Sequence, residues 1–223
     1  MELVARRGRD MLSYMLLHVI KIGASAIAVG ISLVAYVPYL IDMFKGKNKP
    51  HLYNWISIVL ITAIVAYIQL IGGAGVGALP TMIGVGVDSV VLFYCFRFGT
   101  KDIVFMDKVC LAITLVGVVF YIVLNHDPVL SLIILTAAEI ISFVPTFRKT
   151  RNDPYSESLP SYYLIMLKLC LILVALQNYN LLTVSYSVSW LLVFVVFLAS
   201  VYRWQRHARK PQHRQSLEEA PLV

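Results

Sequence analysis

Long uncharged stretches constrain this chain more than any other feature of its sequence. The first of them, residues 22–41, has 20 residues without an acidic or basic side chain, and about 20 apolar residues are enough to span a bilayer as a helix. Charged residues make up only 14% of the 223-residue chain and hydrophobic residues 59%, whereas about 25% of an ordinary globular protein is charged. The composition therefore predicts an all-α, polytopic membrane protein.

Further stretches of this kind predict seven membrane-spanning helices in total. The glycine-rich segment 72–75 ends the second stretch, and Asp127 followed by Pro128 has the residue types of a helix N-cap and first helical position. The expected spans are residues 22–41, 55–71, 80–98, 109–124, 128–147, 161–176 and 185–202.

Lysine and arginine alternate between the loops that connect these spans. Three lie in or beside each of the first, third and fifth loops, none lies in the second, fourth or sixth, and five follow the last span. The positive-inside rule then predicts a cytoplasmic C-terminus and, with seven spans, an N-terminus on the other side. Arg6, Arg7 and Arg9 favour the opposite placement of the N-terminus, but the loops outnumber them. Residues 1–21 are expected to form an amphipathic helix on the membrane surface.

Two prolines mark an internal repeat. Pro38 and Pro145 each lie near the end of a span and precede a basic loop, and Asn54 and Ser161 each lie 16 residues after one of these prolines. We therefore expect a 3+1+3 arrangement of two parallel three-helix repeats. Its parts are residues 22–98 as the first repeat, 99–127 as the connector with the fourth helix, 128–202 as the second repeat and 203–223 as a basic cytoplasmic tail that binds anionic lipid.

This pattern resembles the PQ-loop superfamily, which includes SWEET sugar carriers, lysosomal amino-acid exporters and the KDEL receptor. The resemblance is carried by Val37-Pro38 and Val144-Pro145 with their basic loops, and in topology it extends from about residue 20 to residue 202. The proline-glutamine dipeptide of the family is Pro38-Tyr39 in the first copy and Pro145-Thr146 in the second. The resemblance implies alternating access, with a polar substrate contact on the third helix of each repeat.

The two prolines have two alternative roles. A proline inside a helix removes one backbone hydrogen bond and kinks the helix, so Pro38 and Pro145 are predicted as paired hinges about which the two repeats rock. Alternatively, each proline simply ends its helix at the membrane interface.

Three charged residues lie well inside predicted spans, away from the span ends, where an ionised group is costly unless it is paired or hydrated. Asp88 is a candidate for substrate binding or proton transfer, or else for a structural interhelical hydrogen bond. Glu139, six residues before Pro145, is a candidate proton-coupled switch. Lys168 either pairs with these carboxylates, extends toward the interface or binds an anionic substrate. A site holding all three suits a zwitterionic, cationic or proton-coupled solute.

Other polar and aromatic residues complete the predicted site and its surroundings. Asn54 and Trp55 open the second helix of the first repeat, and Ser161 and Tyr162 open that of the second. Trp55 and Tyr162 could stack on a ligand. Tyrosines near span ends fit an interfacial aromatic belt: Tyr94, Tyr121, Tyr162, Tyr163, Tyr186 and Tyr202.

Several function classes lack support in the sequence. The three cysteines are far apart and lie in apolar stretches, which argues against a disulfide framework or a zinc site. The sequence has no HExxH or GxSxG motif, so no enzyme activity, metal or cofactor is expected. Because the basic residues lie in short loops and at the chain ends, no nucleic-acid partner is expected. We expect a transporter of a small polar solute, with protons as a candidate coupling ion. The alternative is a non-transporting receptor or trafficking protein on the same scaffold.

Overall fold

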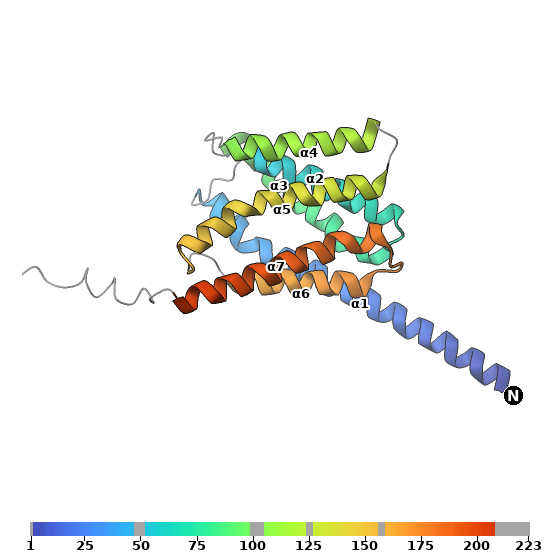
Figure 1. Ribbon diagram of the computed structural model, residues 1–223. Coiled ribbons are helices and arrows are strands. Elements are labelled where there is room, and N and C mark those ends of the chain that lie inside the picture. Colours follow the sequence, from blue (N-terminus) through green and yellow to red (C-terminus); the bar gives the residue numbers. More distant parts are fainter. Residues whose placement is uncertain (1, 47–51, 99–104, 124–126, 156–158, 208–223) are drawn as a thin grey trace, which may run out of the picture.

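The computed structural model describes residues 2–46, 52–98, 105–123, 127–155 and 159–207 of the 223. Within these ranges the chain forms seven α-helices and one short 3-10 turn, and none of the described residues is in a β-strand. The elements, drawn in Figure 1, are α1 (Glu2–Phe44), α2 (Leu52–Ile71), η1 (Gly75–Ala78), α3 (Leu79–Phe98), α4 (Phe105–Val123), α5 (Pro128–Asn152), α6 (Leu159–Ala175) and α7 (Leu181–His207).

Each expected span overlaps one of these helices, with α6 ending one residue before its expected span and residue 124 lying outside the described residues. Four segments are long and apolar enough to cross a membrane, which supports a multi-pass integral membrane protein: Asp10–Ile41, Gly75–Phe98, Pro128–Asn152 and Leu181–His207. The other three helices contain shorter apolar segments, namely Trp55–Ile71, Leu111–Phe120 and Leu159–Ala175. For these three, the crossing of the membrane stays a prediction.

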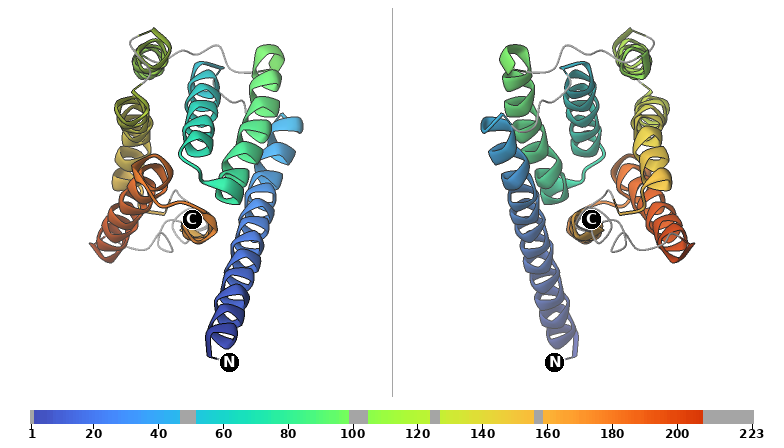
Figure 2. Two further views of the ribbon diagram at one scale, coloured as in Figure 1. Left: turned by 90° about the vertical axis from the view of Figure 1, so that its right-hand side faces the viewer. Right: turned by 90° about the vertical axis from the view of Figure 1, so that its left-hand side faces the viewer.

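The first helix is longer than the sequence predicted. We expected a surface helix over residues 1–21 and a separate span from residue 22, but α1 is continuous over 43 residues, or roughly 65 Å at the standard rise. No proline lies between residues 1 and 37, so nothing there forces the helix to break. The N-terminal part of α1 projects well beyond the other helices (Figures 1 and 2).

The prolines do not end their helices. The helix that contains Pro38 continues to Phe44, and the helix that contains Pro145 continues to Asn152. The alternative that each proline is a helix terminus is therefore wrong. Each proline lies in a helix interior, where the backbone lacks one hydrogen bond. The hinge role stays a prediction.

The N-cap prediction at the start of α5 is confirmed. The Oδ1 atom of Asp127 accepts hydrogen bonds from the backbone N–H groups of Val129 at 3.0 Å and Leu130 at 3.1 Å. Asn180 caps α7 in the same way, accepting bonds from the N–H groups of Leu182 and Thr183. These side chains satisfy N–H groups that would otherwise have no partner at a helix start.

The helices pack in a regular order. α3 contacts both α1 and α2, and α7 contacts both α5 and α6. α1 packs most extensively on α6, while α2 contacts α5. α4 packs on α2 and α5 at the edge of the bundle (Figures 1 and 2). The centre of the bundle is therefore bounded by helices other than α4.

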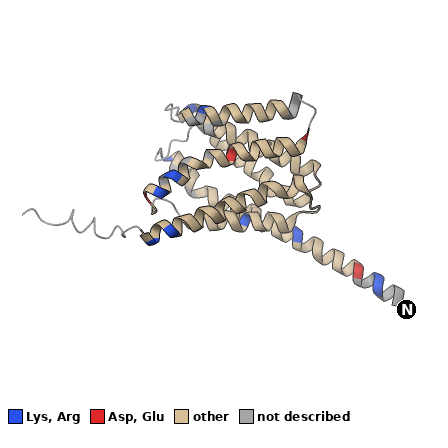
Figure 3. Cartoon of the chain, in the orientation of Figure 1, with Lys and Arg blue, Asp and Glu red and all other residues tan. Residues whose placement is uncertain are grey.

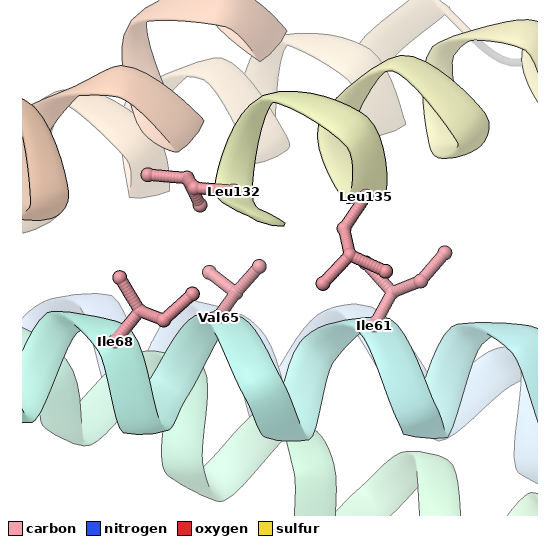
Figure 4. Packing of buried hydrophobic residues seen from close by; sticks show 5 residues of the cluster. All are labelled: Ile61, Val65, Ile68, Leu132 and Leu135. Carbon is pink, nitrogen blue, oxygen red and sulfur yellow. The ribbon is translucent and has the colours of Figure 1, made fainter. Parts of the chain in front are cut away.

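A compact apolar cluster joins α2 to α5. Figure 4 shows three side chains of α2 facing two of α5, all of them at most 2% exposed: Ile61, Val65, Ile68, Leu132 and Leu135. Since lipid is as apolar as these side chains, their contribution comes from close packing rather than from exclusion of water. The cluster connects the first three helices to the last three.

Two loops are hydrogen-bonded to each other at one end of the bundle. The backbone N–H of Gln177 donates to the carbonyl of Ala74 at 3.0 Å, and that of Asn178 donates to the carbonyl of Gly73 at 3.2 Å. The Nδ2 of Asn180 also donates to the carbonyl of Gly72 at 2.7 Å. We call residues 72–75 and 177–180 the inter-loop clasp.

Lysine and arginine gather at the end of the bundle opposite the clasp. Figure 3 shows them at the ends of the helices that lead into the α1–α2, α3–α4 and α5–α6 connections and at the end of α7. Others lie on α1 and within the bundle. Most of the predicted tail, residues 208–223, lies outside the described residues, as do residues 99–104 of the predicted connector.

Candidate functional site

Asp88, Glu139 and Lys168 line one cavity at the centre of the bundle. Its volume is about 240 Å³, and six of the seven helices contribute to its wall, the exception among the described helices being α4. The lining residues are Tyr36, Ile58, Thr62, Pro80, Thr81, Gly84, Asp88, Glu139, Ile165, Lys168, Leu169, Ile172, Tyr186, Trp190 and Phe194. We call this space the central cavity.

Asp88 lies in α3 and is only 2% exposed. Its Oδ1 accepts a hydrogen bond of 2.6 Å from the hydroxyl of Tyr36 on α1. Its Oδ2 lies 3.4 Å from the hydroxyl of Thr62 on α2, which also donates to the carbonyl of Ile58 at 2.7 Å. The carboxyl group is therefore directed into the protein and held mainly by one donor.

Glu139 lies in α5 and accepts two hydrogen bonds from side chains of α7. The indole Nε1 of Trp190 donates to its Oε2 at 3.0 Å, and the hydroxyl of Tyr186 donates to its Oε1 at 3.3 Å. Tyr186 and Trp190 are four residues apart, so they project from the same face of α7. This pair orients both oxygens of the carboxyl group toward α7.

Lys168 lies in α6 and lines the cavity together with both acids. It is near enough to Asp88 and to Glu139 to interact electrostatically with each of them. Its role, whether pairing with the carboxylates, binding of an anionic group or extension toward the membrane interface, stays a prediction. The cavity thus offers two acidic groups and one ammonium to whatever enters it.

The positions of the acid and of its aromatic donors are exchanged between the first three helices and the last three. Asp88 is on α3 and its aromatic donor, Tyr36, is on α1. Glu139 is on α5 and its aromatic donors, Tyr186 and Trp190, are on α7. In the first set of three helices the acid is on the third helix, and in the last set it is on the first. The cavity therefore has acids of different length on different sides.

Ring contacts support the Glu139 side of the cavity. The ring of Trp190 lies 5.1 Å from that of Phe194, and the ring of Phe143 meets Trp190 edge-on at 5.7 Å. Aromatic pairs in these arrangements stabilise a structure beyond the area that they bury. They hold the indole that donates to Glu139 in place.

Three other predicted site residues, Trp55, Ser161 and Tyr162, are not brought into the central cavity. Trp55 is buried in a separate cluster, with its ring 5.6 Å from that of Tyr39. Tyr162 packs against the rings of Phe194 and Phe197, and Ser161 is exposed near the start of α6. None of these three is among the described lining residues. Asn54 lies in α2, but its side chain is outside the described part of the structure.

Four polar residues of the cavity were not predicted from the sequence. Tyr36, Thr62 and Thr81 were not identified, and Tyr186 was wrongly assigned to the interfacial belt, whereas the structure places it in the cavity wall. A signal was available for Thr62, which is a hydroxyl in the middle of an apolar span. The spacing of Tyr186 and Trp190, four residues apart on one helix face, was also visible in the sequence.

Comparison with known proteins does not assign this chain to a family. No family model matches the chain, no curated protein is significantly similar to it, and no solved structure matches it. The functional argument therefore depends on the residues of the cavity themselves.

Proposed function

We propose that the protein is a membrane transporter that binds a small polar solute in the central cavity and moves it by alternating access. One observation carries this proposal: two acids and one lysine line a single cavity in the middle of an apolar helix bundle. Ionisable residues at such depth are costly, and in membrane proteins they mark substrate, ion or proton pathways.

The proposal includes a 3+1+3 arrangement in which all seven helices cross the membrane. Support comes from the packing order, because α3 contacts α1 and α2 just as α7 contacts α5 and α6. The contacts between the two sets of three helices also correspond. In each case the first helix of one set packs on the second helix of the other, α1 on α6 and α5 on α2. Parallel repeats of this kind place a binding site at their interface, and α4 does not contribute to the described wall of the cavity. The PQ-loop resemblance fits this arrangement.

In this proposal the basic end of the bundle faces the cytoplasm and the inter-loop clasp faces the other side. The gathering of lysine and arginine at one end supports this orientation. With seven crossings, the N-terminus then lies on the non-cytoplasmic side and the C-terminus in the cytoplasm.

Alternating access requires parts that open and close. The inter-loop clasp joins the α2–α3 loop to the α6–α7 loop, and its hydrogen bonds must break for the non-cytoplasmic end to open. Pro38 follows the cavity residue Tyr36 by two positions, and Pro145 follows Glu139 by six. A bend at either proline would move the basic end of its helix relative to the cavity.

The chemistry of the cavity favours a small solute that carries a positive charge or both charges. A volume of about 240 Å³ is below the roughly 300–1,000 Å³ typical of pockets for drug-sized ligands. The carboxylates suit an amine and the ammonium of Lys168 suits a carboxylate, so a zwitterion satisfies both. Asp88 or Glu139 would carry a coupled proton.

A thermal-shift screen of the purified protein tests the proposal, because a ligand that binds the native state raises its melting temperature. The probes are free amino acids, small amines and neutral monosaccharides. We expect an amino acid or amine to stabilise the wild-type protein and to lose its effect in Asp88→Asn. A solute that passes this test should then cross proteoliposome membranes. Binding of a peptide without flux of any solute would instead support the receptor alternative.

A further inference from the structure

A groove on the outer surface of the bundle combines apolar walls with two arginines at one end. It lies between α5 and α7 and has a volume of about 540 Å³. We call it the α5–α7 groove and define it by Phe143, Phe147, Leu192 and Val196 along its length and by Arg148 and Arg151 at its end. The groove is separate from the central cavity, so it can hold a ligand whether or not the protein is a transporter.

The length of the groove matches one leaflet of a bilayer. Its lining on α5 runs from Ile140 to Arg151, which is roughly 16 Å along a helix axis. The hydrocarbon core of a bilayer is about 30 Å thick, so the groove covers about half of it. Leu192 and Val196, at 62% and 58% exposure, are open to the outside along this length. An extended acyl chain of one leaflet fits such a surface.

The charged end of the groove suits a phosphate group. Arg148 and Arg151 are both exposed and lie three residues apart, so they project from one side of α5. Guanidinium groups bind phosphate through paired, charge-assisted hydrogen bonds. Trp204 lines the same end and packs edge-on against Phe147 at 5.3 Å. Tryptophan is enriched at the level of lipid headgroups, which places this end of the groove at the membrane interface.

We propose that the α5–α7 groove binds one anionic phospholipid, with its phosphate on Arg148 and Arg151 and one acyl chain along the apolar walls. Basic pockets between helices on the cytoplasmic side of membrane proteins are known to bind anionic headgroups. A free phosphate would leave the apolar walls uncovered, and a zwitterionic lipid would offer the two arginines no net negative charge.

The bound lipid would lie one aromatic ring away from the central cavity. Phe143 lines the groove and meets the ring of Trp190 edge-on at 5.7 Å. Trp190 in turn donates its indole N–H to Glu139 at 3.0 Å. The groove and the cavity thus share a wall, so a lipid in the groove restricts the movement of the side chain that holds Glu139.

Native mass spectrometry of the full-length protein in detergent tests this site. The probes are phosphatidylglycerol and phosphatidylcholine of the same chain length, and inorganic phosphate in a third arm. We expect one tightly bound phosphatidylglycerol, weaker phosphatidylcholine and no retained phosphate. Phosphatidylglycerol should bind the double variant Arg148→Ala/Arg151→Ala roughly 10- to 30-fold more weakly, because each basic residue near an anionic surface contributes measurably to lipid binding.

Matched variants separate this site from general attraction to basic surfaces. Arg203→Ala/Arg206→Ala removes the same charge from exposed residues near the end of α7 that do not line the groove, and it should bind the lipid as the wild type does. Val196→Trp fills the groove with both arginines intact and should weaken binding, whereas Val90→Trp, at another exposed position, should not. The proposal would be overturned if the two double arginine variants lost phosphatidylglycerol binding equally, or if Val196→Trp bound this lipid as the wild type does.

Discussion

The hydroxyl of Tyr36 and the Oδ1 of Asp88 lie 2.6 Å apart and join α1 to α3 inside the central cavity. This is the shortest hydrogen bond described for any acid in the cavity, since Glu139 accepts its bonds at 3.0 and 3.3 Å. Hydrogen bonds to a carboxylate are stronger than those between neutral groups. A solute that binds Asp88 must therefore share it with Tyr36 or displace that hydroxyl.

Replacing Tyr36 by phenylalanine should weaken both the fold and solute binding. The change removes the hydroxyl and keeps the ring, so Asp88 retains only the hydroxyl of Thr62, at 3.4 Å. Leaving a buried carboxyl group without its main hydrogen-bond partner lowers the stability of the folded protein by about 1–3 kcal/mol. We expect the free energy of unfolding to fall by about this amount and solute affinity to fall as well, as measured by thermal melts with and without solute.

Tyr94→Phe is the matched control for that change. The hydroxyl of Tyr94 donates to the carbonyl of Met43 at 2.7 Å, and Tyr94 does not line the described cavity. This variant should lose some stability and bind solute as the wild type does. If Tyr36→Phe also binds solute normally, Asp88 does not need its aromatic donor for function.

Neutralising Lys168 should change which solutes bind. Lys168→Met keeps an unbranched side chain and removes the charge, so a solute with a carboxylate should bind at least roughly tenfold more weakly, equivalent to about 1.4 kcal/mol. A simple amine should bind as well or better, because a like charge has been removed. Titration of an amino acid and of its decarboxylated amine measures the difference. Equal losses for the two solutes would show that Lys168 acts only on the fold.

The glycines of the inter-loop clasp should control access from the end opposite the basic loops. Gly73 and Gly75 have φ of +79° and +58°, and an added Cβ would clash with the side chain of Asn178 or of Gln177. Alanine at either position is thus strained and should loosen the clasp. We expect faster labelling of a cysteine at Thr81, a cavity residue, by a thiol reagent that does not cross membranes.

Gly23→Ala is the control for the clasp variants. A Cβ at Gly23 would have no atom within 4 Å, and Gly23 lies in the helix interior of α1, where alanine is favoured. Labelling at position 81 should be unchanged in this variant. All labelling is done with Cys170→Ser, since Cys170 is an exposed free thiol. If the clasp variants label as slowly as Gly23→Ala, the clasp does not limit access.

The contact between α2 and α5 should depend on close packing. Leu135→Ala removes a fully buried side chain of the cluster shown in Figure 4, a change that costs about 2–5 kcal/mol in soluble proteins. We expect the lower part of this range, because lipid supplies no hydrophobic driving force between helices. Ile133→Ala, at a residue that is 58% exposed, should change the melting temperature little. If Leu135→Ala and Ile133→Ala lowered the melting temperature by similar amounts, the packing of α2 on α5 would not be supported.

The sequence was most informative where membrane physics leaves few choices. Asp88, Glu139 and Lys168 stood out because a charge in an apolar span needs a protein or water environment, and the structure brings all three to one cavity. Tyrosine carries no such constraint, since its ring and hydroxyl suit both an interface and an interior. Tyr186 was therefore assigned to the wrong place, and Tyr36 was not identified.

Helix ends were harder to predict than helix positions. Pro38 and Pro145 were compatible with helix termini, but their helices continue for another turn or more. A proline removes only one backbone hydrogen bond, and the other turns of the helix keep theirs. Trp55 and Tyr162 were predicted near a ligand, yet both lie within one turn of the helix start. At that depth they reach separate aromatic and apolar clusters rather than the cavity.

The most direct measurement is solute uptake into proteoliposomes driven by a pH gradient, compared among the wild type, Asp88→Asn, Glu139→Gln and Tyr94→Phe. The wild type and Tyr94→Phe should accumulate the solute. Asp88→Asn and Glu139→Gln, purified as folded proteins at wild-type yield, should lose most of this uptake, because each keeps the side-chain shape but removes an acid of the cavity. Wild-type rates of uptake in both acid variants would contradict the assignment of the central cavity as the transport site.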